Sequence, residues 1–163
     1  MSLFDTVAQS FPVEKDGVYF GGIAYADNSI VSFQLNDYTN KPSLSKAIKA
    51  MKFIGGGRKV GAAISSVKAG IFDKSGRAGV PKIVVVLMYK KSDDDTVAPA
   101  TSLKGTGVKL IVLGIGKDAD ATALASTASS PDFVLTQNPM RLLLAITTPL
   151  VDKINNGMFY SRS

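Results

Sequence analysis

A run of seven apolar residues, Ile83–Tyr89, constrains the fold more than any other part of this 163-residue chain. A continuous apolar run of this length is typical of a strand that is buried on both faces of a parallel sheet. Two lysines, a serine and three aspartates follow it directly. Ligands of open parallel sheets bind beside the carboxyl ends of the strands. The segment Pro81–Asp95 therefore predicts the fold class and the edge of the sheet where a binding site is expected.

Helical and strand-like patterns alternate along the rest of the chain, which is typical of an α/β fold. The turn of a strand hairpin is expected at Asp27–Ser29, a connector at residues 73–81 and a helix cap at residues 155–157. We expect a single domain over residues 1–157, followed by a tail of residues 158–163. The sheet is predicted to be doubly wound and mainly parallel, with helices on both faces and one antiparallel hairpin at an edge. The predicted helices are 2–11, 42–51, 60–72, 97–103, 119–128 and 140–154, and the predicted strands are 18–25, 30–35, 83–89, 108–115 and 133–135.

The absence of cysteine and histidine excludes several classes of function. Without cysteine there is no thiolate nucleophile or sulfur-ligated metal, and without histidine the commonest general base is missing. We therefore expect no enzyme activity and no cofactor. The net charge of +6 favours an acidic partner. The sequence has no basic helix with interleaved aromatic residues, so nucleic-acid binding is not expected. No apolar run is long enough to predict membrane insertion.

Several ordered segments carry a resemblance to a known family. They are GVPKIVVVL with SDDD, FQLNDYTNKPSLSKAIKAM, FIGGGRKVGAAI and LIVLGIGKDADATALASTASSP. Together they resemble the Rossmann-like von Willebrand factor A domain of extracellular-matrix proteins such as collagen VI, matrilins and integrin inserted domains, over residues 2–154. The resemblance implies an extracellular, non-catalytic module that binds collagen or another matrix protein in adhesion or matrix assembly. The alternative is an intracellular scaffold of the same family in a multiprotein complex, since no signal peptide is visible.

The residues that hold a divalent cation in this family are changed here. The resemblance implies an Asp-x-Ser-x-Ser in the first loop, a threonine in the second and an aspartate in the third. This chain has Arg58 at the second position and Tyr89 at the third, and the first strand and first loop are missing. We therefore expect a degenerate metal-ion-dependent adhesion site that binds no metal. The missing strand indicates either a truncated domain or a permuted one in which Met158–Ser163 supplies the strand.

Five residues are predicted to form a basic ligand face in place of the cation: Arg58, Lys59, Tyr89, Lys90 and Lys91. The two loops that carry these residues, around Arg58 and around Lys90, are expected at the carboxyl edge of the sheet. A guanidinium can bind a carboxylate or a sulfate directly through two parallel hydrogen bonds. The ligand is then a matrix protein such as collagen, or a sulfated glycan. The alternative is that this site is inactive and that binding uses another surface.

Four other motifs have both a structural and a functional interpretation. The three aspartates either begin a helix or bind calcium, and the two glycine motifs are either turns or nucleotide-binding loops. The glycine motifs lack the residues that complete a phosphate-binding signature, which disfavours a nucleotide-dependent enzyme. The basic connector is either a solvated surface or a glycan-binding patch. The motifs are Asp93–Asp95, Gly55–Lys59, Gly114–Gly116 and the set Lys74, Arg77 and Lys82.

Overall fold

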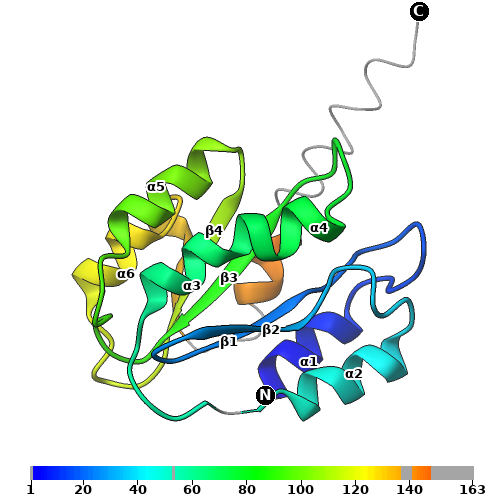
Figure 1. The fold of residues 1–163 in the computed structure, drawn as a ribbon, viewed down its shortest axis with the longest axis horizontal. Helices are drawn as coiled ribbons and strands as arrows, with labels where there is room; N and C mark the ends of the chain where they lie inside the picture. Colours follow the sequence, from blue (N-terminus) through cyan, green and yellow to red (C-terminus); the bar gives the residue numbers. More distant parts are fainter. Residues whose placement is uncertain (1, 53, 137–140, 148–163) are drawn as a thin grey trace, which may run out of the picture.

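Three parallel strands lie at the centre of the molecule, in the order β3-β4-β5 (Figure 1). A computed structural model describes residues 2–52, 54–136 and 141–147. In it, Val86 of β3 is paired with Val112 of β4, which is paired in turn with Val134 of β5. The predicted α/β fold with a parallel sheet is confirmed. The strands are β3 (Ile83–Met88), β4 (Lys109–Gly114) and β5 (Val134–Thr136).

A separate antiparallel hairpin, formed by β1 (Gly22–Tyr25) and β2 (Ser29–Phe33), lies beside this sheet. It confirms the predicted hairpin, although the prediction placed its first strand at residues 18–25. Pairing begins only at Gly22, whose partner Phe33 is the last residue of β2.

Helices cover both faces of the parallel sheet, as predicted. α2 begins at Lys41, one residue before the proline that was expected to open it, and the Asn40 side chain accepts a hydrogen bond from the amide of Ser43 at 2.9 Å. The helix predicted to end at residue 72 continues to Ser75, through a π-helical turn, and stops at Gly76. The bounds are α1 (Ser2–Gln9), α2 (Lys41–Ala50), α3 (Val60–Val67), η1 (Lys68–Phe72), α4 (Asp73–Ser75), α5 (Val97–Gly105), α6 (Ala121–Thr127) and η2 (Pro131–Phe133).

Residues 141–147 are also helical, within the helix predicted for 140–154. The rest of that prediction, the cap at residues 155–157 and the tail at 158–163 lie outside the described residues. No helix in the described ranges is long and apolar enough to cross a bilayer.

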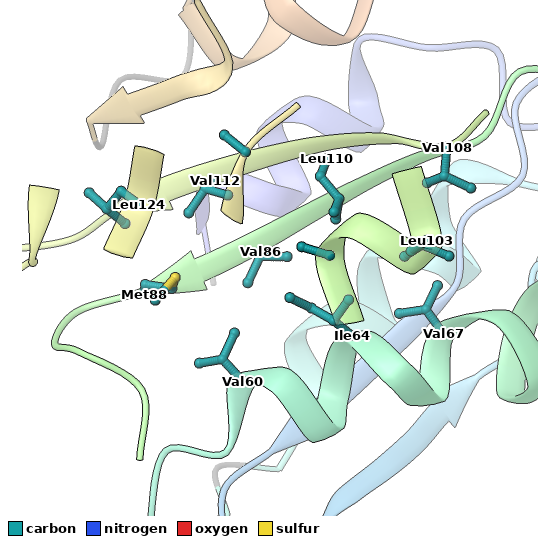
Figure 2. Packing of buried hydrophobic residues seen from close by; sticks show 12 residues of the cluster. Val60, Ile64, Val67, Val86, Met88, Leu103, Val108, Leu110, Val112 and Leu124 are labelled. Atoms are coloured by element: carbon teal, nitrogen blue, oxygen red, sulfur yellow. The ribbon is translucent and has the colours of Figure 1, made fainter. Parts of the chain in front are cut away.

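The core is densest around β4, whose residues Leu110–Leu113 are fully buried. Figure 2 shows one face, where β3 and β4 pack against α3, α5 and α6. On the other face β4 and β5 pack against α1 and Leu142. The run Ile83–Tyr89 was predicted to be buried on both faces, but most of β3 is only half-buried and Tyr89, just after it, is exposed. The reason is that, in the part of the chain that the structure describes, β3 has a paired neighbour on one side only.

Candidate functional site

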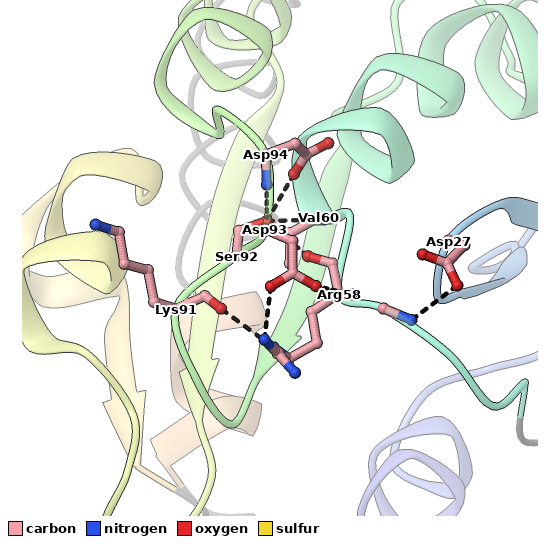
Figure 3. Close-up of polar contacts among 8 residues, drawn as sticks. Asp27, Arg58, Val60, Lys91, Ser92, Asp93 and Asp94 are labelled. Atoms are coloured by element: carbon pink, nitrogen blue, oxygen red, sulfur yellow. Dashed lines mark hydrogen bonds and ion pairs between the residues drawn. The ribbon is translucent and has the colours of Figure 1, made fainter.

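The loops that follow β1 and β3 meet the start of α3 at the carboxyl edge of the sheet (Figure 3). The carbonyl of Ala26 accepts a hydrogen bond from the amide of Lys59 at 2.9 Å. The carboxylate of Asp27 accepts one from the amide of Gly57 at 3.0 Å. A Cβ atom at Gly57 would overlap a carboxylate oxygen of Asp27, so a larger residue there would force this carboxylate to move. These contacts fix the loop that carries Arg58.

Arg58 joins its own loop to the loop that follows β3. Its Nη2 atom lies 2.6 Å from Oδ1 of Asp93, and its backbone amide donates to Oδ2 of the same carboxylate at 2.7 Å. Its Nε atom donates to the carbonyl of Lys91 at 3.3 Å. Hydrogen bonding with Tyr89 and attraction to Asp93 raise the pKa of Arg58 above its ordinary value. The guanidinium is therefore already paired within the domain.

Ser92 and Asp94 attach the same loop to the first turn of α3. The Ser92 hydroxyl oxygen lies 2.7 Å from the carbonyl of Arg58 and 2.6 Å from Oδ1 of Asp94, and its one proton is shared between these two acceptors. The two oxygens of Asp94 accept hydrogen bonds from the amides of Gly61 at 2.9 Å and Ala62 at 2.8 Å. Burial alone would raise the pKa of Asp94, but the hydrogen bonds from Ser92, Gly61 and Ala62 outweigh it and lower this pKa. The ionised carboxylate thus caps the helix.

Asp95 begins the next helix. Its oxygens accept hydrogen bonds from the amides of Val97 at 2.9 Å and Ala98 at 3.3 Å, at the start of α5. Of the three aspartates, only Asp95 therefore lies at the start of the helix that follows them; Asp94 caps α3 instead, and Asp93 is bound to Arg58. Asp93, Asp94 and Asp95 are thus each bound to a different backbone or side-chain partner.

A divalent cation does not fit this arrangement. Such a cation needs several oxygen ligands that converge on one point. Here both oxygens of Asp93 are held by Arg58, and both oxygens of Asp94 are held by helix amides. Within the described ranges, no group of three or more acidic or other metal-ligating side chains is arranged to hold a metal ion. The guanidinium of Arg58 brings a fixed positive charge to the carboxylate that would otherwise attract one.

The structure brings the five predicted site residues to one edge, but their surroundings differ. Arg58 is paired, as described above. The side chains of Lys59, Lys90 and Lys91 are exposed, and Tyr89 is 52% exposed. The ammonium of Lys90 lies 3.9 Å from a carboxylate oxygen of Asp118, a long contact between exposed groups. We call Lys59, Tyr89, Lys90 and Lys91 the carboxyl-edge face.

Sequence reasoning missed three residues that hold this edge together. Asp27 was assigned only to a hairpin turn, yet its carboxylate binds the second loop. Ser92 was given no role, and Asp93 was considered only as a calcium ligand or a helix-start acid. The one available signal was the density of acidic side chains directly after an apolar strand, opposite an arginine in a glycine-rich loop.

The fold and this edge define a doubly wound α/β domain that presents loops at the carboxyl ends of its strands. Residues 2–147 match the von Willebrand factor type A domain family. The chain therefore belongs to this family, as the sequence resemblance indicated.

Several relatives are collagen chains. Mouse collagen alpha-4(VI) is 31% identical over 129 residues, which cover 79% of this chain and 6% of the relative. Collagen alpha-1(XII) of Notophthalmus viridescens is 30% identical over 160 residues, which cover 93% of this chain and 17% of the relative. Human von Willebrand factor A domain-containing protein 2 is 28% identical over 117 residues, which cover 71% of this chain and 16% of the relative. The chain thus spans a small part of each relative.

Solved structures agree with this assignment. Proximal thread matrix protein 1 from the mussel byssus superposes with a TM-score of 0.78 and 26% identity, over 93% of this chain and 40% of that chain. The manganese-loaded TRAP protein of Plasmodium vivax has a TM-score of 0.74 and 15% identity, over 88% of this chain and 62% of that chain. At 15% identity, the second likeness supports the fold alone.

Proposed function

We propose that this domain is a non-catalytic module that binds an acidic protein of the extracellular matrix, without a metal ion, through the carboxyl-edge face. Its collagen relatives support a role in adhesion or matrix assembly. Collagen or a neighbouring matrix protein is the expected partner, and a sulfated glycan shares the required negative charge. The relatives also support an extracellular location.

One observation carries the metal-independent part of this proposal: the guanidinium of Arg58 is bound to the carboxylate of Asp93. A related structure of the mussel byssus protein is described as having a zinc-occupied MIDAS motif. In this chain the corresponding edge has an internal ion pair instead of an arrangement that fits a cation. Arg58 then serves to hold the loop, while the exposed cations beside it contact the ligand.

The chemistry of the face favours an acidic surface as the ligand. The face combines three exposed lysine side chains with an exposed phenol, Tyr89. Tyrosine supplies a rigid apolar contact with a polar end, which is why it is enriched in interfaces. Lysines at the rim of an interface mainly accelerate association and favour a partner of negative charge. Binding through lysine and tyrosine side chains involves no proton transfer and no nucleophile, which is consistent with a non-catalytic module.

Charge reversal at the face tests the proposal. The double variant Lys90→Glu/Lys91→Glu is compared with Lys15→Glu/Lys109→Glu, whose lysines are also exposed but precede β1 and begin β4. Both double variants change the net charge equally, from +6 to +2, since each substitution removes two charge units. Binding to immobilised collagen, and separately to heparin, is measured by surface plasmon resonance.

The proposal predicts that the Lys90/Lys91 variant weakens binding about tenfold or more and flattens its dependence on salt. The Lys15/Lys109 variant is expected to stay within about twofold of wild type at physiological salt, where distant charges are screened. Equal losses in the two variants would show that only net charge matters and would contradict a localised face. Binding that disappears in EDTA would contradict the metal-independent mechanism.

A further inference from the structure

One stretch of the chain carries the whole excess of positive charge. Residues 38–72, between Asp37 and Asp73, contain seven of the 19 lysines and arginines and no acidic residue. The rest of the chain therefore has 12 cations against 13 acids, so its net charge is close to zero. In the structure the stretch forms α2, the loop that carries Arg58, α3 and η1. The positive field of the domain is thus expected to be strongest on these elements.

Four of the seven cations already have partners, all of them from outside the stretch. They are Lys41, Lys49, Arg58 and Lys68, bound respectively to the carbonyl of Gln9 and the carboxylates of Asp5, Asp93 and Asp73. The other three, Lys46, Lys52 and Lys59, are exposed and form no ion pair with the residues that the structure describes. Within the stretch, the charge that is open to a ligand belongs mainly to these three lysines.

Lysines form a row along the exposed side of α2. Lys46 and Lys49 are three residues apart, which places them on the same face of the helix. Leu44 and Ile48 form the opposite, buried face. Lys52 continues the spacing of three residues just beyond the end of the helix. We call Lys46, Lys49 and Lys52 the α2 row.

The α2 row leads along the chain to the carboxyl-edge face, which begins at Lys59. Residues 51–59 connect α2 to the start of α3 (Figure 1). A hollow of about 600 Å³ lies beside this connection and is lined by residues of α2 and β2, and Lys52 is the one charged residue among its described lining residues. Asp27 adds a negative charge nearby, where its carboxylate binds the amide of Gly57. The surface between the row and the face therefore has space for a ligand beside the lysines.

We propose that a sulfated glycan binds along the α2 row and reaches the carboxyl-edge face through Lys59. The inference rests on the proposed function, because Lys59 belongs to that face. A lysine ammonium is a hydrated point charge on a flexible stem, so it binds an anion without a fixed geometry. A linear sulfated chain repeats negative charge along its length and is therefore complementary to a row of such cations.

A protein partner fits the row less well. Lysine is depleted from the cores of protein–protein interfaces, where aromatic residues and arginine supply most of the binding energy. The α2 row contains neither, and α2 has no acidic residue that would pair with basic groups on a protein surface. The row is therefore assigned to a glycan, whereas the carboxyl-edge face, with its exposed Tyr89, also suits a protein.

Removal of two charges from the row tests the assignment on the full chain. Lys46→Gln/Lys52→Gln, the row variant, leaves Lys49 paired with Asp5. Binding to heparin, desulfated heparin, single-stranded DNA and collagen is measured by surface plasmon resonance over a range of salt concentrations. The circular dichroism spectrum of each variant checks that it is folded.

Two other double variants remove the same charge elsewhere. Lys15→Gln/Lys109→Gln is the matched control, since its lysines are exposed but precede β1 and begin β4. Lys90→Gln/Lys91→Gln removes two lysines of the carboxyl-edge face, so it reports on the proposed function separately from the row.

We expect the row variant to bind heparin about tenfold more weakly than wild type at physiological salt. For a linear polyanion, the slope of log affinity against log salt concentration falls by about one for each lysine contact that is lost, so this slope should fall by about two. The Lys15/Lys109 variant should stay within about twofold of wild type. Collagen binding of the row variant should also stay within about twofold, and desulfated heparin should bind much more weakly than heparin.

Three results would overturn the assignment. The first is equal heparin binding by the row variant and the Lys15/Lys109 variant. The second is a loss of collagen binding in the row variant as large as its loss of heparin binding, which would assign the row to a protein. The third is binding of single-stranded DNA or desulfated heparin as tight as that of heparin, which would show that sulfate is not recognised.

Failure of the proposed function has a different signature. The Lys90/Lys91 variant would then bind heparin and collagen like wild type, while the row variant still loses heparin binding. That result would contradict the carboxyl-edge face and support the α2 row as a separate glycan site.

Discussion

Replacement of Asp94 by alanine is expected to destabilise the domain by about 2 kcal/mol. The carboxylate accepts hydrogen bonds from the amides of Gly61 at 2.9 Å and Ala62 at 2.8 Å, and from the hydroxyl of Ser92 at 2.6 Å. Loss of a helix cap costs about 0.5–2 kcal/mol, and loss of a bond to a charged acceptor costs about 1.5–3 kcal/mol. Because Asp94 is only half-buried, water replaces part of this loss.

The assay is thermal and urea unfolding followed by far-ultraviolet circular dichroism, since the chain has no tryptophan. A change of 2 kcal/mol lowers the melting temperature of a domain of this size by about 4–8 °C. Asp118→Ala is the matched control, because its carboxylate has only a long, exposed contact with Lys90 and should matter by less than about 0.5 kcal/mol. Equal stability of the two variants would refute the capping role.

The pH dependence gives an independent check. The folded-state pKa of Asp94 is lowered from its ordinary value of 3.8, so its contribution to stability is present above that value. The contribution is lost as the pH falls through the folded-state pKa. The difference in unfolding free energy between wild type and Asp94→Asn should therefore be constant near neutral pH and shrink on acidification below about pH 4. A difference that persists unchanged at low pH would contradict this assignment.

Three further substitutions test other parts of the structure. Gly61→Ala should lower the free energy of unfolding in urea by about 1–3 kcal/mol, because a Cβ there would overlap the backbone carbonyl of Asp95. Gly105→Ala is the control: a Cβ there has open space, so the change should be small. Leu110→Ala, at a fully buried position, should cost about 2–5 kcal/mol in the same assay, against a small effect of Ile30→Ala at the surface. Burial, and to a lesser extent the charge of the nearby Tyr89, raises the pKa of Tyr25 to about 12. The free energy of unfolding should therefore fall as the pH rises from 10 to 12, because the unfolded state ionises first. In an ultraviolet titration, Tyr25→Phe should remove the tyrosine that ionises last.

Much of the fold follows from periodic patterns in the sequence. Residues 83–89 are a continuous apolar run, residues 110–113 are a second one preceded by Lys109, and both form parallel strands. The relative burial of the two strands could not be predicted from their composition, because the longer apolar run is the less buried one. Burial depends on neighbours: among the described residues, β4 has a paired strand on each side, whereas β3 has one on a single side. The start of β1 at Gly22 likewise coincides with the last residue of its partner strand, Phe33, which the residues of β1 alone do not reveal.

The candidate site was predicted in position but not in its internal bonding. The sequence placed Arg58 and Tyr89 at one edge, because loops after parallel strands meet there. Which acceptor binds the guanidinium could not be predicted, since Arg58 and Asp93 are 35 residues apart and no periodic pattern relates them. The arginine was expected to face a ligand, and the structure instead pairs it with its own domain.

The most direct test of the central claim, that an internal ion pair replaces the cation, is a calorimetric titration of the full chain with manganese and with magnesium. The account predicts no saturable heat for either ion, because the oxygens of Asp93 are held by Arg58. Saturable binding in the micromolar range that Asp93→Ala abolishes would contradict it.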